Sequence, residues 1–312
     1  MQVTSSEYWC QAWLERERLR KETEQQAQPS ESFAGQEVDY WDSRATDYAK
    51  HATKSPYATA FLDLLGRPEK KTILDFGAGT GTLAIPLAQA NNKVIACDFS
   101  TRMLEELARW AQNEDIMLVA EVNALAAASL QRFASLGSTF DGGQIAPKRI
   151  SWTDDWARVG IADKSVDIAV ASRSTMVGDL GEAFDKLERA ARERVAVTMS
   201  TEFRPHGFKM LGSGAHGSKA TGGFVPDHIL AMNILFFKGA YPELHYIDSY
   251  KSVEKEQAAE AVATGASAET GVAVATGVAD ATDAAPTTDT AAETAPELRL
   301  VRWAFITWEP VR

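Results

Sequence analysis

The sequence predicts an α/β fold: a doubly wound sheet of seven mostly parallel strands with an antiparallel last strand. Between residues 71 and 200, short β-rich segments alternate with helical segments, which is the order of a parallel sheet covered by helices on both faces. A glycine-rich turn directly follows the first of these strands. Two β-rich segments, 244–250 and 298–310, resemble the two strands of a hairpin, so the last strand is expected to run antiparallel.

Residues 1–60 are expected to form a helical extension ahead of the sheet. An amphipathic start and a strongly charged end mark the segment EYWCQAWLERERLRKETEQQ, so we expect it to pack only partly. Aromatic and polar residues are mixed in the segment DYWDSRATDYAKHA, which suits a lid. Trp41 and Tyr48 are the candidates in this lid for contact with a substrate.

The core of the domain is expected over residues 61–250. Its first five strands are expected at 71–76, 93–98, 149–152, 166–172 and 194–200. Helices are expected in TLAIPLAQAN, in STRMLEELARWAQ, in an alanine-rich stretch around 118–136 and in DLGEAFDKLERAARE. Ser100 is a natural N-cap for the second of these helices, whose apolar face carries Met103, Leu104 and Leu107.

An acidic segment rich in Ala and Thr, residues 251–296, separates the core from its last strand at 297–312. It contains no aromatic residue, Leu, Ile or Met, and it holds eight acidic residues against two lysines. Such a composition cannot bury enough apolar surface to offset the entropy of ordering the chain, so we expect a disordered or weakly helical insertion. An extra pair of strands is the alternative, although Gly265, Gly271 and Gly277 would interrupt it.

Composition and charge narrow the class of protein. The chain has 312 residues, of which 45% are hydrophobic, and no apolar run is long enough to predict a membrane span. The N-terminus does not have the pattern of a secretory signal, so a cytoplasmic protein is expected. A net charge of −11 without a stripe of Lys and Arg makes nucleic acid an unlikely main partner. The five histidines and two cysteines show no metal-ligand spacing, so no metal is expected.

The glycine turn lies in the stretch TILDFGAGTGTLAIPLAQANNKVIACDFS, residues 72–100. A phosphate-binding loop of the GxxxxGK type would need a lysine after the glycines, and none is present. A dinucleotide fingerprint, GxGxxG, would need a third glycine at Thr82. The spacing here is GxGxG, with glycines at 77, 79 and 81, so a nucleoside triphosphate and NAD are both disfavoured.

The segment LDFGAGTGTLAIPLA, with an acidic residue two positions before the first glycine, resembles the first motif of class I S-adenosylmethionine-dependent methyltransferases. The segment VIACDFSTRML is similar to the second motif, in which an acidic residue ends the second strand. The resemblance covers roughly residues 40–250 and the last strand. It implies S-adenosylmethionine as the cofactor, S-adenosylhomocysteine as its product, and transfer of a methyl group to O, N or C of a small molecule.

The resemblance also implies roles for individual residues. Asp75 would order the turn and help to hold the amino end of the methionine moiety. The backbone from Gly77 through Ala78 and Gly79 to Gly81 would run against the cofactor, where a Cβ would collide. Asp98 would accept hydrogen bonds from both ribose hydroxyls, since a carboxylate offers two oxygens to a vicinal diol. A residue that starts a helix is the alternative for Asp98 taken alone.

The adenine end of the cofactor would meet residues after the second and third strands. Phe99 and Met103 would supply an apolar wall, beside the helix start at Ser100. An acidic residue after the third strand, either Asp154 or Asp155, would meet the adenine amino group. Trp156 would pack on the ring, or it belongs to the core.

The acceptor side of the site is less defined. The segment after the fourth strand reads ASRSTMVGDL and lacks the (N/D)PP(Y/F) motif of enzymes that methylate amino groups of nucleobases or glutamine. Ser172 and Arg173 are expected at the mouth of the site, where Arg173 would hold a carboxylate or phosphate; pairing with Asp179 is the alternative. His206 is the candidate general base, with a solvated loop histidine as the alternative.

The function predicted from the sequence is therefore methyl transfer to a small-molecule acceptor. A binding or regulatory protein with a methyltransferase-like fold and a methyltransferase acting on protein or RNA are the alternatives. The sequence does not identify the acceptor or the oligomeric state.

Overall fold

The computed structural model describes residues 5–26, 37–52, 56–119, 142–201, 225–252 and 298–311. The chain divides into a larger unit, Met1–Ser249 with Arg302–Arg312, and a smaller unit, Tyr250–Val301. The smaller unit is described only at its two ends, which belong to strands β7 and β8. His206, nearly all of the alanine-rich stretch at 118–136 and most of the insertion at 251–296 lie outside the described residues.

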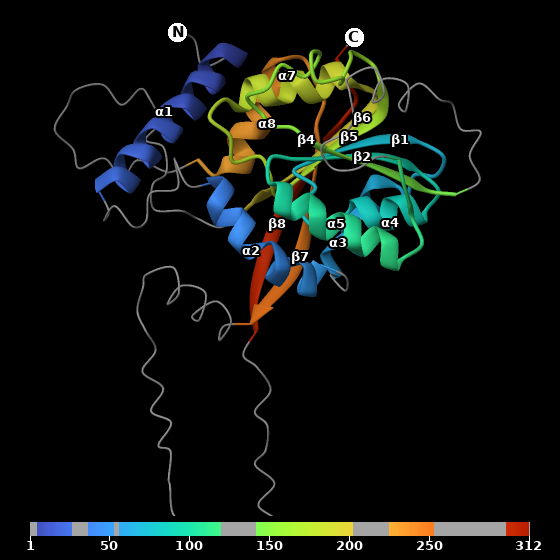
Figure 1. The fold of residues 1–312 in the computed structure, drawn as a ribbon. Helices are drawn as coiled ribbons and strands as arrows, with labels where there is room; N and C mark the ends of the chain where they lie inside the picture. The colour runs from blue at the N-terminus through green and yellow to red at the C-terminus, as the bar shows by residue number, and fades with distance from the viewer. Residues whose placement is uncertain are drawn as a thin grey trace, which may run out of the picture. The chain divides into compact units, whose positions relative to one another are not determined.

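The described strands form one sheet in the order β3-β4-β2-β1-β5-β6-β8-β7 (Figure 1). The strands are β1 Thr72–Phe76, β2 Lys93–Asp98, β3 Met117–Leu118, β4 Gln144–Arg149, β5 Val166–Ser172, β6 Ala191–Ser200, β7 Glu243–Ser252 and β8 Leu298–Trp308. The pairs from β3 to β6 are parallel, whereas β8 runs antiparallel to β6. The predicted doubly wound sheet with an antiparallel last strand is confirmed.

Two details of the predicted sheet are wrong. The sheet has an eighth strand, β3, which is a two-residue edge strand too short to stand out in the sequence. The third predicted strand, 149–152, is instead β4, which ends at Arg149. Pro147, which lacks a backbone N–H, lies within β4, and β3 pairs only with Gln144 and Ile145. Pro147 therefore lies beyond the end of β3, and prolines are tolerated at such edges.

The described residues form seven helices. They are α1 Ser6–Gln26, α2 Glu37–Ala52, α3 Pro56–Leu65, α4 Ala84–Gln89, α5 Thr101–Asn113, α7 Leu180–Ala190 and α8 Asp227–Phe237. The N-cap predicted at Ser100 is confirmed, because its hydroxyl accepts a hydrogen bond from the Met103 amide at 3.1 Å. Helix α7 ends at Ala190, earlier than predicted, because the residues from Ala191 on pair with β5.

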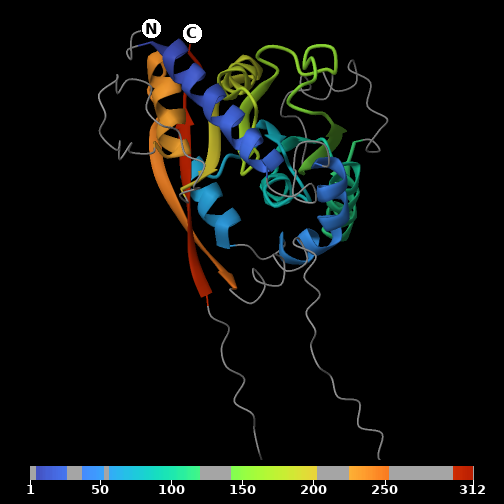
Figure 2. The ribbon, with the colours of Figure 1, turned by 90° about the vertical axis from the view of Figure 1, so that its left-hand side faces the viewer.

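Alternate residues of the strands bury two apolar clusters, one on each face of the sheet. On one face, side chains of α1, α7 and α8 pack with strand residues such as Leu74 and Ile95. On the other face, side chains of α3, α4 and α5 pack with the neighbouring residues Ile73 and Val94. Figure 2 shows α1 running beside α8 on the first of these faces. Within the described ranges, no helix is both long and apolar enough to cross a membrane.

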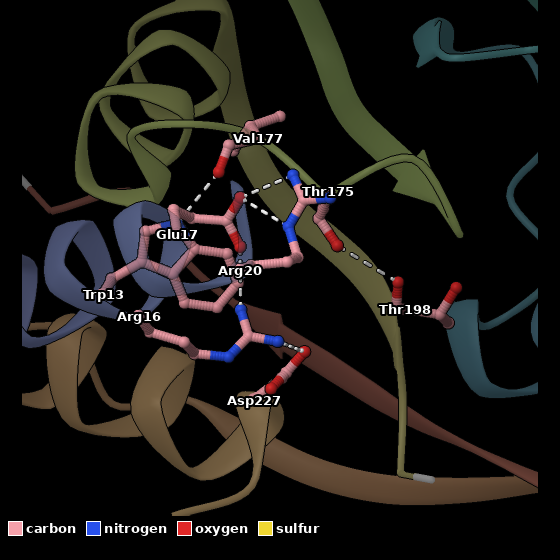
Figure 3. A network of polar contacts seen from close by, with 8 residues as sticks. All are labelled: Trp13, Arg16, Glu17, Arg20, Thr175, Val177, Thr198 and Asp227. Carbon is pink, nitrogen blue, oxygen red and sulfur yellow. Dashed lines mark hydrogen bonds and ion pairs between the residues drawn. The ribbon is translucent and has the colours of Figure 1, made fainter. Parts of the chain in front are cut away.

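The packed part of α1 carries a buried polar network (Figure 3). The Trp13 indole nitrogen donates to the Val177 carbonyl at 2.9 Å, which joins α1 to the loop after β5. The Arg16 guanidinium bonds Glu17 at 3.0 Å and Asp227, at the start of α8, at 2.5 Å. Arg16 and Glu17 are only 6% and 4% exposed. Buried charges of this kind depend on their partners, so the network fixes how α1 sits on α8.

We predict that Arg16→Ala destabilises the protein strongly, because it leaves the Glu17 and Asp227 carboxylates without this partner in a largely buried setting. Breaking such a pair costs roughly 3 kcal/mol, which urea unfolding followed by circular dichroism would measure. Arg18→Ala is the control, because Arg18 pairs with Glu15 and Glu22 on the exposed side of the same helix. Equal effects of the two substitutions would contradict a structural role for the buried network.

Candidate functional site

The turn between β1 and α4 has a backbone that only glycine adopts easily. Gly77, Gly79 and Gly81 all have positive φ, at 75°, 54° and 97°. A Cβ on Gly77 would lie 2.2 Å from the Ser174 Cβ, and one on Gly81 would lie 3.0 Å from a side-chain carbon of Ile85. A Cβ on Gly79 would meet nothing within 4 Å. Packing within the protein thus explains the outer two glycines, while the backbone of Gly79 borders open space.

Two buried oxygen atoms in this turn have no hydrogen-bond partner among the described residues. They are Oδ2 of Asp75 and the hydroxyl of Thr80. Asp75 is 1% exposed, and burial is the main reason why its pKa rises to about 7. The Asp98 carboxylate raises the pKa of Asp75 further, and the Ala84 amide opposes the rise. An unpartnered buried carboxylate oxygen is costly, so this position suits a ligand that brings a positive charge or a hydrogen-bond donor.

Asp98, at the end of β2, joins the turn to the start of α5. Its Oδ2 accepts a hydrogen bond from the Gly79 amide and its Oδ1 accepts one from the Ser100 amide, both at 2.9 Å. Burial raises the pKa of Asp98 to about 6, against the lowering effect of the Ser100, Gly79 and Phe99 amides. Each carboxylate oxygen can accept a second hydrogen bond, so this geometry leaves capacity for a diol. Asp98 therefore also helps to start helix α5, which was the alternative role considered for it.

Helix α2 reaches this site through a residue that sequence reasoning missed. The Ser100 hydroxyl donates to Oδ1 of Asp42 at 2.5 Å, and the Thr46 hydroxyl donates to Glu106 of α5 at 3.0 Å. No pattern in the sequence marks Asp42, because its partner lies 58 positions away. The lid candidates Trp41 and Tyr48, one on each side of it, contact each other edge to face at 5.5 Å.

The end of β5 carries a second group of polar contacts. The buried Tyr57 hydroxyl lies 2.7 Å from the Ser172 hydroxyl and 2.6 Å from the Thr198 hydroxyl. The Ser174 hydroxyl donates to the Phe76 carbonyl at 2.7 Å, which holds this segment against the end of β1. Tyr57 and Thr198 were missed because each lies in an apolar helix or strand and resembles a core residue.

Within the described part of the chain, Arg173 makes no ion pair with Asp179, the partner considered as its alternative. The Asp179 carboxylate instead caps α7 by accepting from the Glu182 amide at 2.9 Å. Arg173 itself has φ 56°, and its amide donates to the Thr198 hydroxyl at 3.0 Å.

The residues expected at the adenine end have partners within the protein. Asp154 accepts from the Ser151 amide at 2.7 Å, and Asp155 pairs with the exposed Arg158. Trp156 stacks on Phe76 with ring centroids 4.4 Å apart, in the apolar cluster of that face. These three residues line an open cleft of about 350 Å³ beside α7.

After β2, Met103 is buried and Phe99 is half-buried. Adenine contact by Phe99, Met103, Trp156 and either Asp154 or Asp155 stays a prediction.

We predict that Asp75→Asn makes the ligand-free protein more stable at pH 8. Because the pKa of Asp75 rises from 3.8 to about 7 on folding, the folded state holds a proton that the unfolded chain has lost. The corresponding stability is complete below pH 3.8 and is lost as pH rises through 7. Removing the carboxylate should stabilise the protein at pH 8 by roughly 2–4 kcal/mol and flatten the pH dependence.

Urea unfolding at pH 5 and pH 8 would measure this effect, with Asp63→Asn, an exposed residue of α3, as the control. A variant that loses stability at both pH values, or one that keeps the wild-type pH dependence, would show that Asp75 is not the strained acid described above.

Known proteins resemble this chain. A family model described as a methyltransferase domain matches residues 73–159. An uncharacterized protein of Haemophilus influenzae is 30% identical over 214 residues, which cover 67% of this chain and 66% of that protein. The chain thus spans just under two thirds of that relative's length. A probable dimethyladenosine transferase of Drosophila melanogaster is 31% identical over 67 residues, 21% of this chain and 22% of that protein.

Among solved structures, magnesium protoporphyrin IX methyltransferase from Synechocystis PCC 6803, with bound S-adenosylhomocysteine, aligns with a TM-score of 0.45 and 13% identity. The alignment covers 88% of this chain and 97% of that protein. The region matched by the family model contains the glycine turn, Asp98 and the loop through Trp156. The match over residues 73–159 and the geometry of the turn place this part of the chain in the class I S-adenosylmethionine-dependent methyltransferase superfamily.

Proposed function

We propose that this protein transfers the methyl group of S-adenosylmethionine to an O, N or C atom of a small-molecule acceptor. The observation that carries the proposal is the pairing of open space at Gly79 with the unpartnered, buried Oδ2 of Asp75 on the same turn. Folding of the protein alone does not require either feature. Both fit a cofactor that approaches a backbone closely and carries an amino group.

The residues of the turn divide the binding of this cofactor among them. Asp75 would take the ammonium of the methionine moiety, which would compensate its buried charge. Each oxygen of Asp98 accepts one hydrogen bond from a backbone amide and can accept a second, so Asp98 would bind the ribose hydroxyls. S-adenosylmethionine, when bound, supplies a methyl group on an electrophilic sulfonium. Such a transfer requires mainly that the protein aligns the acceptor and excludes water, so no universal catalytic side chain is needed.

A small molecule fits the chain better than nucleic acid does. The net charge of −11 would repel a phosphate backbone, and binding to such a backbone usually depends on clustered Lys and Arg. The similarity to a probable dimethyladenosine transferase covers only 21% of this chain. RNA as the acceptor therefore has little support. Catalysis by His206 stays a prediction, because this residue lies outside the described residues.

We predict that Gly79→Ala leaves the protein folded but weakens binding of S-adenosylhomocysteine at least tenfold. The new Cβ meets no protein atom, so the methyl group acts on the ligand beyond the cost of placing alanine at a positive φ, a cost that the control below shares. Calorimetry would measure affinity and urea unfolding would measure stability. Gly239→Ala is the matched control, because Gly239 also has positive φ and open space but lies after α8. Unchanged affinity in folded Gly79→Ala, with stability equal to that of Gly239→Ala, would place the cofactor elsewhere.

We further predict that the protein transfers labelled methyl groups into a fraction of small molecules. The test incubates the purified chain with methyl-labelled S-adenosylmethionine and an extract of the cells in which it is natively made, and separates the products by size. Gly79→Ala provides the background. Label in protein or RNA would replace the small-molecule proposal. Binding of S-adenosylhomocysteine without transfer to any fraction would favour a methyltransferase-like binding protein.

A further inference from the structure

The guanidinium of Arg173, the residue after β5, lies against two aromatic rings. The central carbon of its guanidinium lies 4.4 Å from the centre of the Tyr57 ring and 5.7 Å from the centre of the Trp303 ring. The side chain is exposed, and no ion pair found between described residues includes it. Aromatic faces attract a cation but do not use its N–H groups. The guanidinium is thus held in place, and no hydrogen bond between described residues uses its N–H groups.

The backbone of Arg173 is also constrained. Its φ of 56° lies in the left-handed region, which a residue other than glycine, Asn or Asp adopts only where its surroundings require it. The amide donates to the hydroxyl of Thr198, which is fully buried, and the next residue is tied to β1 through the Ser174 hydroxyl. Strained residues of this kind concentrate at functional sites. The contacts of the backbone therefore fix the position from which the guanidinium extends.

This position adjoins the glycine turn. Strand β5 pairs with β1 so that Asp75 lies opposite Val170, three residues before Arg173. Ser174 is the residue that a side chain on Gly77 would strike, so the segment after β5 lies directly against the turn. Tyr57, under the guanidinium, bonds Ser172 of the same segment. Arg173 therefore lies beside the proposed cofactor position.

We infer that Arg173 determines acceptor specificity by binding an oxyanion, a carboxylate or a phosphate, on the small-molecule acceptor. The inference rests on the function proposed above. A guanidinium offers paired N–H groups that match the two oxygens of such an anion, and the contacts with the Tyr57 and Trp303 rings hold the guanidinium in position. Lysine would supply the charge without this planar geometry.

The test uses the full chain saturated with S-adenosylhomocysteine. Calorimetry measures the binding of benzoate and phenyl phosphate, with benzamide as a neutral probe of similar shape. We expect at least one of the two anions to bind with millimolar affinity, and benzamide to bind at least tenfold more weakly. Arg173→Gln should weaken the anion at least tenfold and Arg173→Lys by a smaller factor. Neither change should alter the affinity for S-adenosylhomocysteine more than twofold.

Arg302→Gln is the matched control. The Arg302 guanidinium lies over a tyrosine ring too, at 5.8 Å from the centre of Tyr246, but it is paired with Asp248. Its loss should leave anion binding unchanged. The anion that binds more tightly identifies the acceptor as a carboxylate or a phosphate.

Two results would overturn the inference: neither anion binds the wild type, or Arg173→Gln binds both anions as the wild type does. Failure of S-adenosylhomocysteine to bind folded protein would instead refute the proposed function. Repeating the anion titration without S-adenosylhomocysteine distinguishes failure of the inference on Arg173 from failure of the proposed function.

Discussion

The two hydrogen bonds accepted by Asp98 organise the rest of the site. One holds the amide of Gly79 and the other holds the amide of Ser100, so a single carboxylate joins the turn after β1 to the start of α5. The Ser100 hydroxyl continues this chain of contacts to Asp42 of α2. Because Asp98 is nearly buried, its two amide bonds have to offset much of the cost of removing its charge from water. The carboxylate that holds the site together is therefore itself costly to bury.

Asp75 adds to this cost instead of reducing it. Its buried carboxyl lies close enough to Asp98 that each negative charge disfavours the other, and one of its oxygens has no partner among the described residues. Natural proteins retain such destabilising arrangements mainly where a ligand or a reaction needs them. A positively charged ligand group at Asp75 would relieve the strain, which couples ligand binding to the stability of the turn.

Local signals in the sequence were sufficient for the parallel core and the glycine turn. The N-cap at Ser100, the strand ends at Phe76 and Asp98 and the alternation of strands with helices all arise from neighbouring residues. The contacts around Arg173 could not be predicted in this way. Tyr57 and Thr198 are 141 positions apart. Trp303 comes from the far end of the chain, and these residues meet only because β6 pairs with both β5 and β8. The start of β4 at Gln144 was missed as well, and the short length of β3 explains how β4 accommodates Pro147.

A crystal structure of the protein with S-adenosylhomocysteine would test the central claim most directly. We expect the amino group of the ligand within hydrogen-bonding distance of Oδ2 of Asp75. The ribose hydroxyls should bond Asp98, and the homocysteine part of the ligand should lie against the backbone of Gly79. A ligand bound away from the turn, with Oδ2 of Asp75 still unpartnered, would contradict the assignment of this turn as the cofactor site.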